Sequence, residues 1–236
     1  MFTRLRVGLV FQSSPSPNGC QTLPSQSNPF ASRYVRPGAL PFRFRSNDRP
    51  DAIVAQLREV RFGAIVGDHG TGKSTLLREL AGHLEEEMPG GQWVQLTRDE
   101  NPGLVSGIAN SRVVLNCQRL VSAGGVLVID GGEQLPSLAR RIAARRTRRC
   151  GHFCLLTAHD EIPGFEILYR TSLDVDLIHE LIAELLPPPL LPTDEVLRQR
   201  IYEHVAQTDL TTIDNLRVLW DQLYEVAELV YRGELN

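Results

Sequence analysis

Nine consecutive residues, Gly67 to Thr75, have the types and the spacing that bind the phosphates of a nucleotide. They read GDHGTGKST and satisfy the pattern G-x-x-x-x-G-K-[ST], directly after an apolar segment and directly before an amphipathic one. Glycines let the backbone form a concave nest of amide hydrogens, and the following helix adds the positive end of its dipole. We expect Lys73 to reach the β- and γ-phosphates, Ser74 to ligate Mg²⁺ and Thr75 to help hold the α-phosphate. The expected nucleotide-binding residues are Gly67, Asp68, His69, Gly70, Thr71, Gly72, Lys73, Ser74 and Thr75.

A second element with related chemistry begins at Val126 and ends in a carboxylate at Asp130, 57 residues after Lys73. Together, GDHGTGKST and VLVID resemble the Walker A and Walker B elements of the P-loop NTPases. In that superfamily the carboxylate holds Mg²⁺, usually through a coordinated water, and the resemblance assigns this role to Asp130. The alternative is an aspartate that closes a buried strand before a Gly-Gly turn.

The general base is less clearly indicated. Many ATPases that resemble this chain carry a glutamate directly after the Walker B aspartate, but here Gly131 occupies that place. Glu133 is the candidate base, and Gln134 is an alternative that would orient the attacking water. Glu133 would equally suit the first turn of a helix, where the helix dipole favours a carboxylate. If the base is absent, we expect slow hydrolysis and a nucleotide-controlled switch.

Thr157 and His159 end another apolar segment, HFCLLT, and its continuation AHD. Open α/β sheets bind ligands at the carboxyl ends of their strands, so both are candidates to sense the γ-phosphate. Thr157 matches the position of such a residue in related ATPases, and His159 offers the better chemistry. The alternative is a pair of hydrogen-bonded residues without a catalytic role.

An arginine cluster follows the second motif, and three explanations stay open for it. It could bind the phosphate backbone of nucleic acid or another acidic partner, reach a neighbour's γ-phosphate as an arginine finger, or form a solvated helix face. Arg170 is a weaker candidate for a finger or a sensor. The cluster consists of Arg140, Arg141, Arg145, Arg146, Arg148 and Arg149.

The four cysteines do not form the framework of a secreted disulfide-rich protein. Cys150, His152 and Cys154 have soft ligands at close spacing, but no second ligand pair accompanies them, so metal binding is disfavoured. Cys20 and Cys117 have no partner nearby in sequence. A reducing compartment and a soluble, cytoplasmic protein are therefore expected, since no apolar run is long enough to cross a membrane.

Composition excludes several functions. The 236 residues contain 25 basic and 28 acidic side chains, and Lys73 is the only lysine. A single lysine excludes Schiff-base chemistry elsewhere and the Asn-Lys-x-Asp loop with which GTPases read guanine. The net charge of −3 means that any attraction to polyanions must come from a local patch.

Apolar and helical segments alternate along the chain, which favours a mostly parallel sheet covered on both faces. We expect strands at 63–66, 93–96, 125–130, 152–157 and 165–169, and helices at 73–87 and 111–122. Helical periodicity dominates beyond Asp174, with N-caps expected at Thr193 and Thr212. An aromatic and aliphatic stripe on the last helix is expected to pack in a core: Trp220, Leu223, Tyr224, Ala227, Val230 and Tyr231.

The spacing of the two motifs, the polar end of the fourth strand and the helical tail narrow the resemblance to the AAA+ and AAA-like ATPases. It implies an α/β P-loop fold, a three-layer αβα sandwich with strand order 5-1-4-3-2, and a C-terminal helical lid. The implied organisation is a flexible leader at 1–47, a nucleotide-binding core at 48–172 and a lid at 173–236, with residues 36–42 bordering the adenine. No Gly-Ala-Arg lid motif is visible and the segment between the motifs is short, so the subfamily stays open.

The function expected from the sequence is ATP binding with slow, Mg²⁺-dependent hydrolysis, coupled to the helical tail, to a protein partner or to a homo-oligomer. One alternative is a regulatory binding module with little hydrolysis. Another is a kinase that phosphorylates a small acceptor.

Overall fold

The computed structural model describes residues 27–45, 48–96 and 104–235, with the side chains of 104–106 excepted. Most of the expected leader, including Cys20, lies outside these residues. The described chain divides into two compact units. The first contains residues 44–67 and 76–171, and the second contains the described residues up to 43 together with 68–75 and 172–235. The boundaries expected at residues 48 and 173 remain predictions.

The first unit is built on five parallel strands in the order β2-β3-β4-β1-β5. Read from the other edge this is 5-1-4-3-2, so the α/β fold and its strand order are confirmed. Val66 lies beside Ala158, and Gln95 beside Asp130, so the strands end at a common carboxyl edge. The strands are β1 (Phe62–Val66), β2 (Gln92–Gln95), β3 (Val126–Asp130), β4 (Phe153–Ala158) and β5 (Glu166–Arg170).

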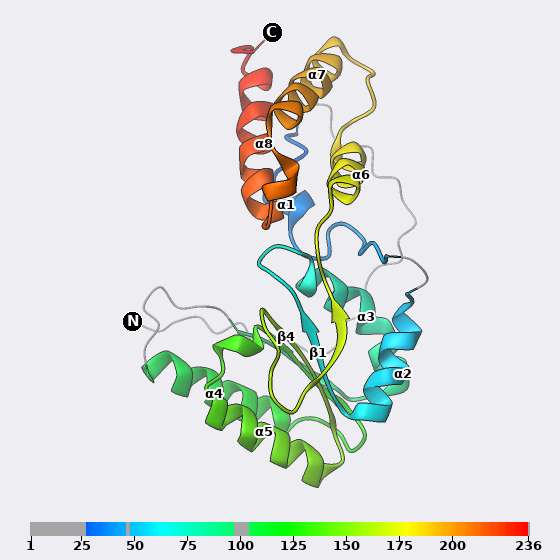
Figure 1. Ribbon diagram of the computed structural model, residues 1–236, viewed down its shortest axis with the longest axis vertical. Coiled ribbons are helices and arrows are strands. Elements are labelled where there is room, and N and C mark those ends of the chain that lie inside the picture. The colour runs from blue at the N-terminus through cyan, green and yellow to red at the C-terminus, as the bar shows by residue number, and fades with distance from the viewer. Residues whose placement is uncertain (1–26, 46–47, 97–103, 236) are drawn as a thin grey trace. The chain divides into compact units, whose positions relative to one another are not determined.

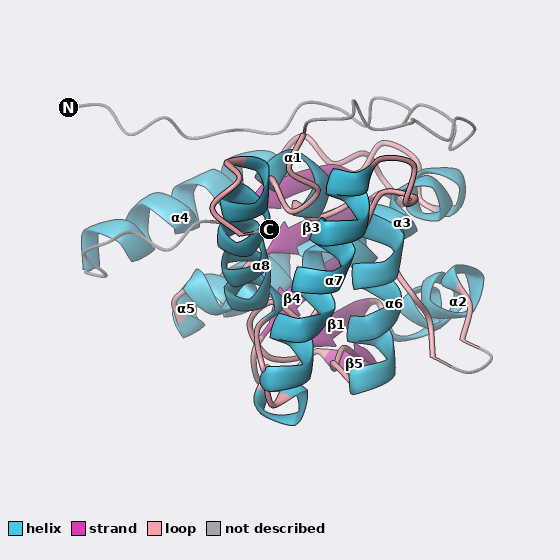
Figure 2. Ribbon diagram, turned by 90° about the horizontal axis from the view of Figure 1, so that it is seen from above, coloured by secondary structure: helices cyan, strands magenta, loops and turns pink. Residues whose placement is uncertain are grey.

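Helices cover both faces of this sheet, as Figures 1 and 2 show. α4 (Leu104–Gln118) and α5 (Ser137–Cys150) lie on one face, and α2 (Pro50–Val60) and α3 (Lys73–Glu87) lie on the other. The three central strands are buried along nearly their whole length, because their residues are apolar toward both faces. The sheet therefore holds the side chains at its carboxyl edge on a rigid platform.

The structure corrects one helix of the first unit. The sequence predicts a helix near 111–122 that starts at Ser111, whereas α4 runs from Leu104 to Gln118. Ser111 lies inside the helix and its hydroxyl donates to the carbonyl of Gly107, four residues earlier. Serine makes this bond in helix interiors, so it is no reliable mark of a helix start.

The second unit has a core of its own, built mainly from three long helices. Trp220 is buried there and stacks on Phe30, with 5.9 Å between ring centroids. Most of the expected aromatic and aliphatic stripe is buried in this core, but Tyr224 is 38% exposed. No helix in the described residues is long and apolar enough to span a membrane. The helices are α1 (Ser32–Val35), α6 (Val175–Leu185), α7 (Pro192–Gln207) and α8 (Leu216–Tyr231), with a short 3-10 turn at Leu210–Thr212.

Two expected N-caps in this unit are wrong. Helix α7 begins at Pro192 after Leu191, and Asp194 accepts a hydrogen bond from the amide of Leu191, so Thr193 lies within the first turn. Thr212 ends the 3-10 turn, and Asn215 caps α8 instead. Proline suits the first position of a helix because that amide would have no partner, which moves the start one residue earlier.

Candidate functional site

The loop that follows β1 adopts the compact form that its glycines allow. Gly70 and Gly72 have φ values of 74° and 97°, a region that other residues avoid. The ammonium of Lys73 donates to the carbonyl of Asp68 over 2.6 Å, and the hydroxyl of Thr71 donates to the same oxygen over 2.9 Å. Asp68 therefore ties the loop to the start of α3, and the cation lies folded back against the loop itself.

Two other segments of the second unit pack against this loop. A Cβ atom at Gly70 would come within 2.0 Å of Oδ1 of Asn215, the residue that caps α8. A Cβ atom at Gly72 would come within 3.3 Å of the ring of Phe42. Phe42 belongs to the segment expected to border the adenine, a role that remains a prediction. Asn215 carried no functional signal in the sequence, because its contact with Gly70 exists only in the folded chain.

Asp130 is held firmly at the end of β3. It is 7% exposed, and the hydroxyl of Thr157 at the end of β4 donates to its Oδ1 over 2.8 Å. The amide of Gly131 donates to the same hydroxyl oxygen over 2.8 Å. Thr157 thus has its only proton committed to Asp130, so it orients this carboxylate and has no donor left for a phosphate in this arrangement.

Gly131 explains why no glutamate follows Asp130 directly. It adopts the left-handed conformation at φ 92°, and a Cβ atom would lie 2.8 Å from the carbonyl oxygen of Leu96. A side chain at this position would have to displace backbone. The chain instead continues through Gly131 into a 3-10 turn, η1 (Gly132–Gln134), which places Glu133 next to the end of β4.

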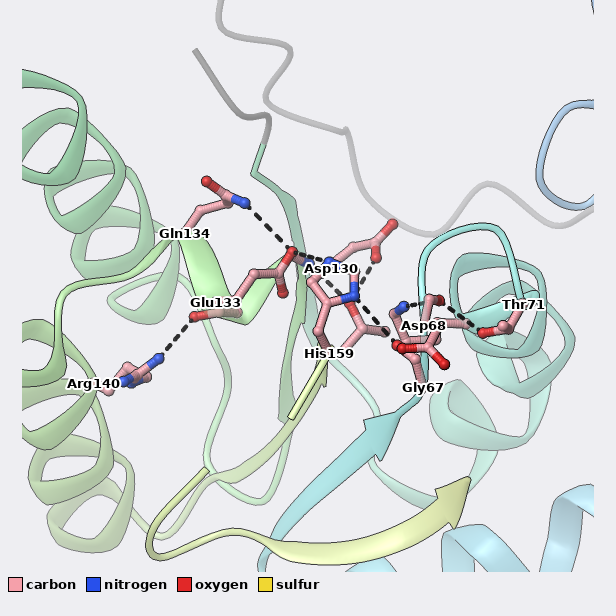
Figure 3. A network of polar contacts seen from close by, with 12 residues as sticks. Gly67, Asp68, Thr71, Asp130, Glu133, Gln134, Arg140 and His159 are labelled. Atoms are coloured by element: carbon pink, nitrogen blue, oxygen red, sulfur yellow. Dashed lines mark hydrogen bonds and ion pairs between the residues drawn. The ribbon is translucent and has the colours of Figure 1, made fainter. Parts of the chain in front are cut away.

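Glu133 faces His159, as Figure 3 shows. Its Oε1 lies 3.3 Å from Nε2 of His159, and the side-chain amide of Gln134 donates to the same oxygen through Nε2 over 3.4 Å. Its Oε2 is buried and has no hydrogen-bond partner. One oxygen is therefore engaged and the other is shielded from solvent, so Glu133 must turn before it can contact a water molecule.

His159 joins the two ends of this arrangement. Its Nδ1 lies 3.3 Å from the carbonyl oxygen of Gly67, the first residue of the phosphate loop, while Nε2 faces Glu133. Both neighbours offer hydrogen-bond acceptor atoms to the imidazole ring. The side chains of His159 and Glu133 are 23% and 29% exposed. His159 is thus the strand-end residue with access to its surroundings, whereas Thr157 is buried.

The arginine cluster divides in the structure. Arg140 extends toward the site, where Nη1 lies 3.5 Å from the carbonyl oxygen of Gly132 (Figure 3). Arg148 lies over the ring of Phe62, 4.9 Å from its centroid. Arg141, Arg145 and Arg149 are exposed on the outer side of α5, and Arg146 is partly buried. Arg170, the weaker candidate, pairs with Glu161.

Cys150, His152 and Cys154 are not arranged as a metal site. Cys150 is exposed at the end of α5, whereas Cys154 is buried in β4, where burial raises the pKa of its thiol to about 12. Burial also lowers the pKa of His152. Among the described residues, no group of three or more His, Cys, Asp or Glu side chains is placed to hold a metal ion. A magnesium ion that arrives with a nucleotide needs fewer, because phosphates and waters supply most of its ligands.

Comparison with known proteins identifies no family. No family model matches the chain, and no curated protein matches it. A solved structure of PCH-2 from C. elegans is similar at 12% sequence identity with a TM-score of 0.42. The match covers 79% of this chain and 66% of that one, so this chain spans slightly less than two thirds of the length of its neighbour.

Proposed function

We propose that this chain binds MgATP at the carboxyl edge of its sheet and hydrolyses it slowly. The observation that carries the proposal is the loop between β1 and α3, which satisfies a phosphate-binding pattern in full and holds the only lysine of the chain. Its glycines adopt the left-handed conformations that a backbone nest requires. In the same sheet, β3 ends in a buried and hydrogen-bonded carboxylate, Asp130, a type of ligand that Mg²⁺ prefers.

Each residue has a role that its contacts support. Backbone amides of the loop bind phosphate oxygens, and Lys73 exchanges the Asp68 carbonyl for a phosphate oxygen. Ser74 and Asp130 would hold Mg²⁺, which when bound would neutralise charge on the phosphates. Thr157 keeps Asp130 in one orientation.

Glu133 accepts the proton of the attacking water, and its contact with His159 explains why we expect slow turnover. In the structure, Oε1 of Glu133 is engaged by His159 and Gln134, and Oε2 is shielded. Water activation requires Glu133 to leave this arrangement. Because His159 also contacts Gly67, a change in the phosphate loop is a physical route by which a bound nucleotide releases Glu133.

Nucleotide binding is tested by calorimetric titration with MgATP. Lys73→Ala should weaken binding by about tenfold or more, equivalent to about 1.4 kcal/mol. Lys73→Arg keeps the charge but changes its geometry, so it should restore binding only in part. Unchanged affinity in Lys73→Ala would exclude this loop as the phosphate site.

Hydrolysis is tested by phosphate release. Glu133→Gln should lower turnover by about 100-fold, because general bases contribute factors of this order, while MgATP affinity stays within about twofold. Gln134→Ala is the matched control from the same turn. A rate that Glu133→Gln leaves unchanged removes Glu133 as the base.

A regulatory module with little hydrolysis is a second candidate, and one contact favours it. Gly70 in the phosphate loop packs against Asn215 at the start of α8, and both belong to the second unit. Movement of the loop when a nucleotide binds would therefore press directly on the cap of a helix. Trp220, buried in α8, offers a signal for such movement.

The second candidate is tested by fluorescence. In a Trp93→Phe background, Trp220 is the only tryptophan, and its emission should change when MgATP is added. The change should also occur with a non-hydrolysable ATP analogue and in the Glu133→Gln variant. A signal that follows hydrolysis alone would contradict the module.

A further inference from the structure

The two helices on one face of the sheet carry an unusual balance of charge. α4 and α5 together contain seven arginines and neither aspartate nor glutamate, and Arg119 follows directly after α4. The whole chain nevertheless carries a net charge of −3. A positive surface of this kind is therefore a local feature, and it is separate from the phosphate loop.

Six of these eight arginines are exposed and lack a carboxylate partner among the residues that the structure describes, and one of the six, Arg148, lies over the ring of Phe62. The other five are Arg112 in α4, Arg119 just after it, and Arg141, Arg145 and Arg149 on α5. We call these five residues the α4–α5 basic surface. Elsewhere, exposed arginines are either paired, as Arg58 is with Glu87 and Arg232 with Glu228, or occur singly along the chain, as Arg78 and Arg217 do. The basic surface thus concentrates charge that the fold leaves uncompensated.

The two helices hold these charges in fixed rows. Gln118 near the end of α4 donates to the carbonyl of Ala143 and to the hydroxyl of Thr147, both on α5. Near the other end, Gly107 lies so close to Pro136 that a Cβ atom would come within 2.9 Å of its ring. The helices therefore run in the same direction, and Figure 1 shows them side by side.

The arginines of the basic surface recur at helical spacing along α5. On α5 they are four residues apart, which corresponds to a rise of about 6 Å per step. On the neighbouring α4, Arg112 is the one arginine, and Arg119 follows directly after the last residue of that helix. Like charges at such spacing repel one another and do not stabilise a helix. Closely spaced phosphates would remove this repulsion, because each guanidinium group can donate two parallel hydrogen bonds to the oxygens of one phosphate.

We propose that the α4–α5 basic surface binds the phosphate backbone of nucleic acid without reading its sequence. A membrane surface fits less well, because the exposed apolar residues of α5 are only one adjacent pair, Leu138 and Ile142, and the next two residues along the chain that would extend an apolar face, Ala139 and Ala143, are buried. An interfacial helix needs a continuous apolar face. This proposal does not depend on nucleotide binding.

A second copy of this chain also fits less well. Residues 172–236 carry 13 acidic and 4 basic side chains, but several carboxylates already serve their own fold. Glu184, Glu203 and Glu228 pair with arginines, and Asp174 and Asp194 bond to backbone amides. The acidic unit therefore offers fewer available charges than its sequence indicates.

The test is fluorescence anisotropy with a labelled DNA duplex of mixed sequence and about 30 base pairs, titrated with the full chain between about 50 and 200 mM salt. The triple variant Arg141→Gln, Arg145→Gln and Arg149→Gln should bind at least about tenfold more weakly at 100 mM salt. For this variant, the slope of log K against log salt should become less negative by about 2.7, because each lost phosphate contact removes about 0.9. Arg145→Gln alone should make the slope less negative by about 0.9.

The matched control removes the same charge elsewhere: Arg58→Gln, Arg200→Gln and Arg232→Gln, three arginines that are paired. It should bind like the wild type. The proposal fails if the wild type does not bind the duplex at about 50 mM salt, if its salt slope is flat, or if the control loses as much affinity as the triple variant. The proposal also fails if the chain binds phosphatidylserine vesicles and does not bind the duplex. It fails as well if light scattering shows that the wild type forms an oligomer and the triple variant does not, while the two bind the duplex with the same affinity.

Discussion

Two acid-containing pairs lie near the carboxyl edge of the same sheet and differ in how fully they are hydrogen-bonded. Asp130 and Thr157 are buried, and the hydroxyl of Thr157 both donates to Asp130 and accepts from the amide of Gly131. Glu133 and His159 are partly exposed, and one oxygen of Glu133 has no partner. The first pair has the properties of a fixed ligand and the second those of a group that moves.

The difference follows from where the side chains come from. Asp130 and Thr157 belong to neighbouring central strands, which parallel pairing holds in register. Glu133 belongs to a short 3-10 turn, and His159 lies one residue beyond β4. Strands over-determine the position of their side chains, whereas a short turn and a strand end do not. Under the proposed function, the proposed metal ligand Asp130 lies on a central strand and the proposed base Glu133 lies on an adjustable turn.

Gly131 separates the two pairs, and changing it should have the largest effect on stability. We expect Gly131→Ala to lower the free energy of unfolding by about 2 to 4 kcal/mol, because it adds left-handed strain to a clash with the carbonyl of Leu96. Urea denaturation measures this cost. Gly124→Ala is the matched control: its φ is 78°, but a Cβ atom there meets nothing within 4 Å, so it should cost only about 1 kcal/mol. Equal costs at the two positions would mean that the turn accommodates a side chain.

Thr157→Val should have the next largest effect. It leaves the buried carboxylate and the amide of Gly131 without their shared partner, which should cost about 1 to 3 kcal/mol of stability. Thr157→Ser keeps the hydroxyl and should cost less. If Thr157 orients Asp130, the valine variant should also need more Mg²⁺ for half-maximal nucleotide binding, and the serine variant should not. The orienting role is excluded if both variants show the same dependence on Mg²⁺.

The comparison also separates what the sequence could and could not predict. The strand order and the parallel sheet were predictable, because continuous apolar runs alternating with helical periodicity leave few topologies open. The phosphate loop was predictable as a pattern, because its glycines and its lysine are close together in sequence. Asp130 was placed at a strand end for the same reason.

The relations between side chains were not predictable. The commitment of the Thr157 proton to Asp130 depends on two strands that are far apart in sequence. The sequence favoured Thr157 by position and His159 by chemistry for the sensing role, and their difference in burial appears only in the folded chain. The absence of a glutamate at Gly131 looked like a loss of function, but the clash with Leu96 shows that the fold requires glycine there.

The side chain of His152 lies outside the site and buries a polar atom, and its effect on stability depends on pH. Nδ1 of His152 is buried without a partner, and burial lowers the pKa of this side chain below its ordinary value of 6.5. Above pH 6.5 the ring is neutral in both states and stability does not depend on it. Below pH 6.5 the unfolded chain binds the proton first, so stability should fall as the pH falls, by at most about 1.4 kcal/mol per pH unit.

His152→Phe should reduce this acid-dependent loss, as measured by urea denaturation between about pH 7 and pH 5. His83→Phe is the matched control, because His83 is partly exposed and faces Asp51. If the variant and the wild type lose stability in parallel over this range, His152 does not cause the loss.

The smallest effect on stability should come from the movable pair itself. Glu133 and His159 are about a quarter exposed, so solvent screens the contact between them and it should contribute less than about 1 kcal/mol. A double-mutant cycle of Glu133→Gln and His159→Ala in urea measures the coupling between them. The same Glu133→Gln variant should nevertheless lose most phosphate release. The two measurements together separate the effect of Glu133 on the rate from its effect on the free energy of unfolding. A coupling above about 2 kcal/mol would make the pair a fixed structural element, because a base held that strongly could not turn toward water without a comparable cost to the reaction.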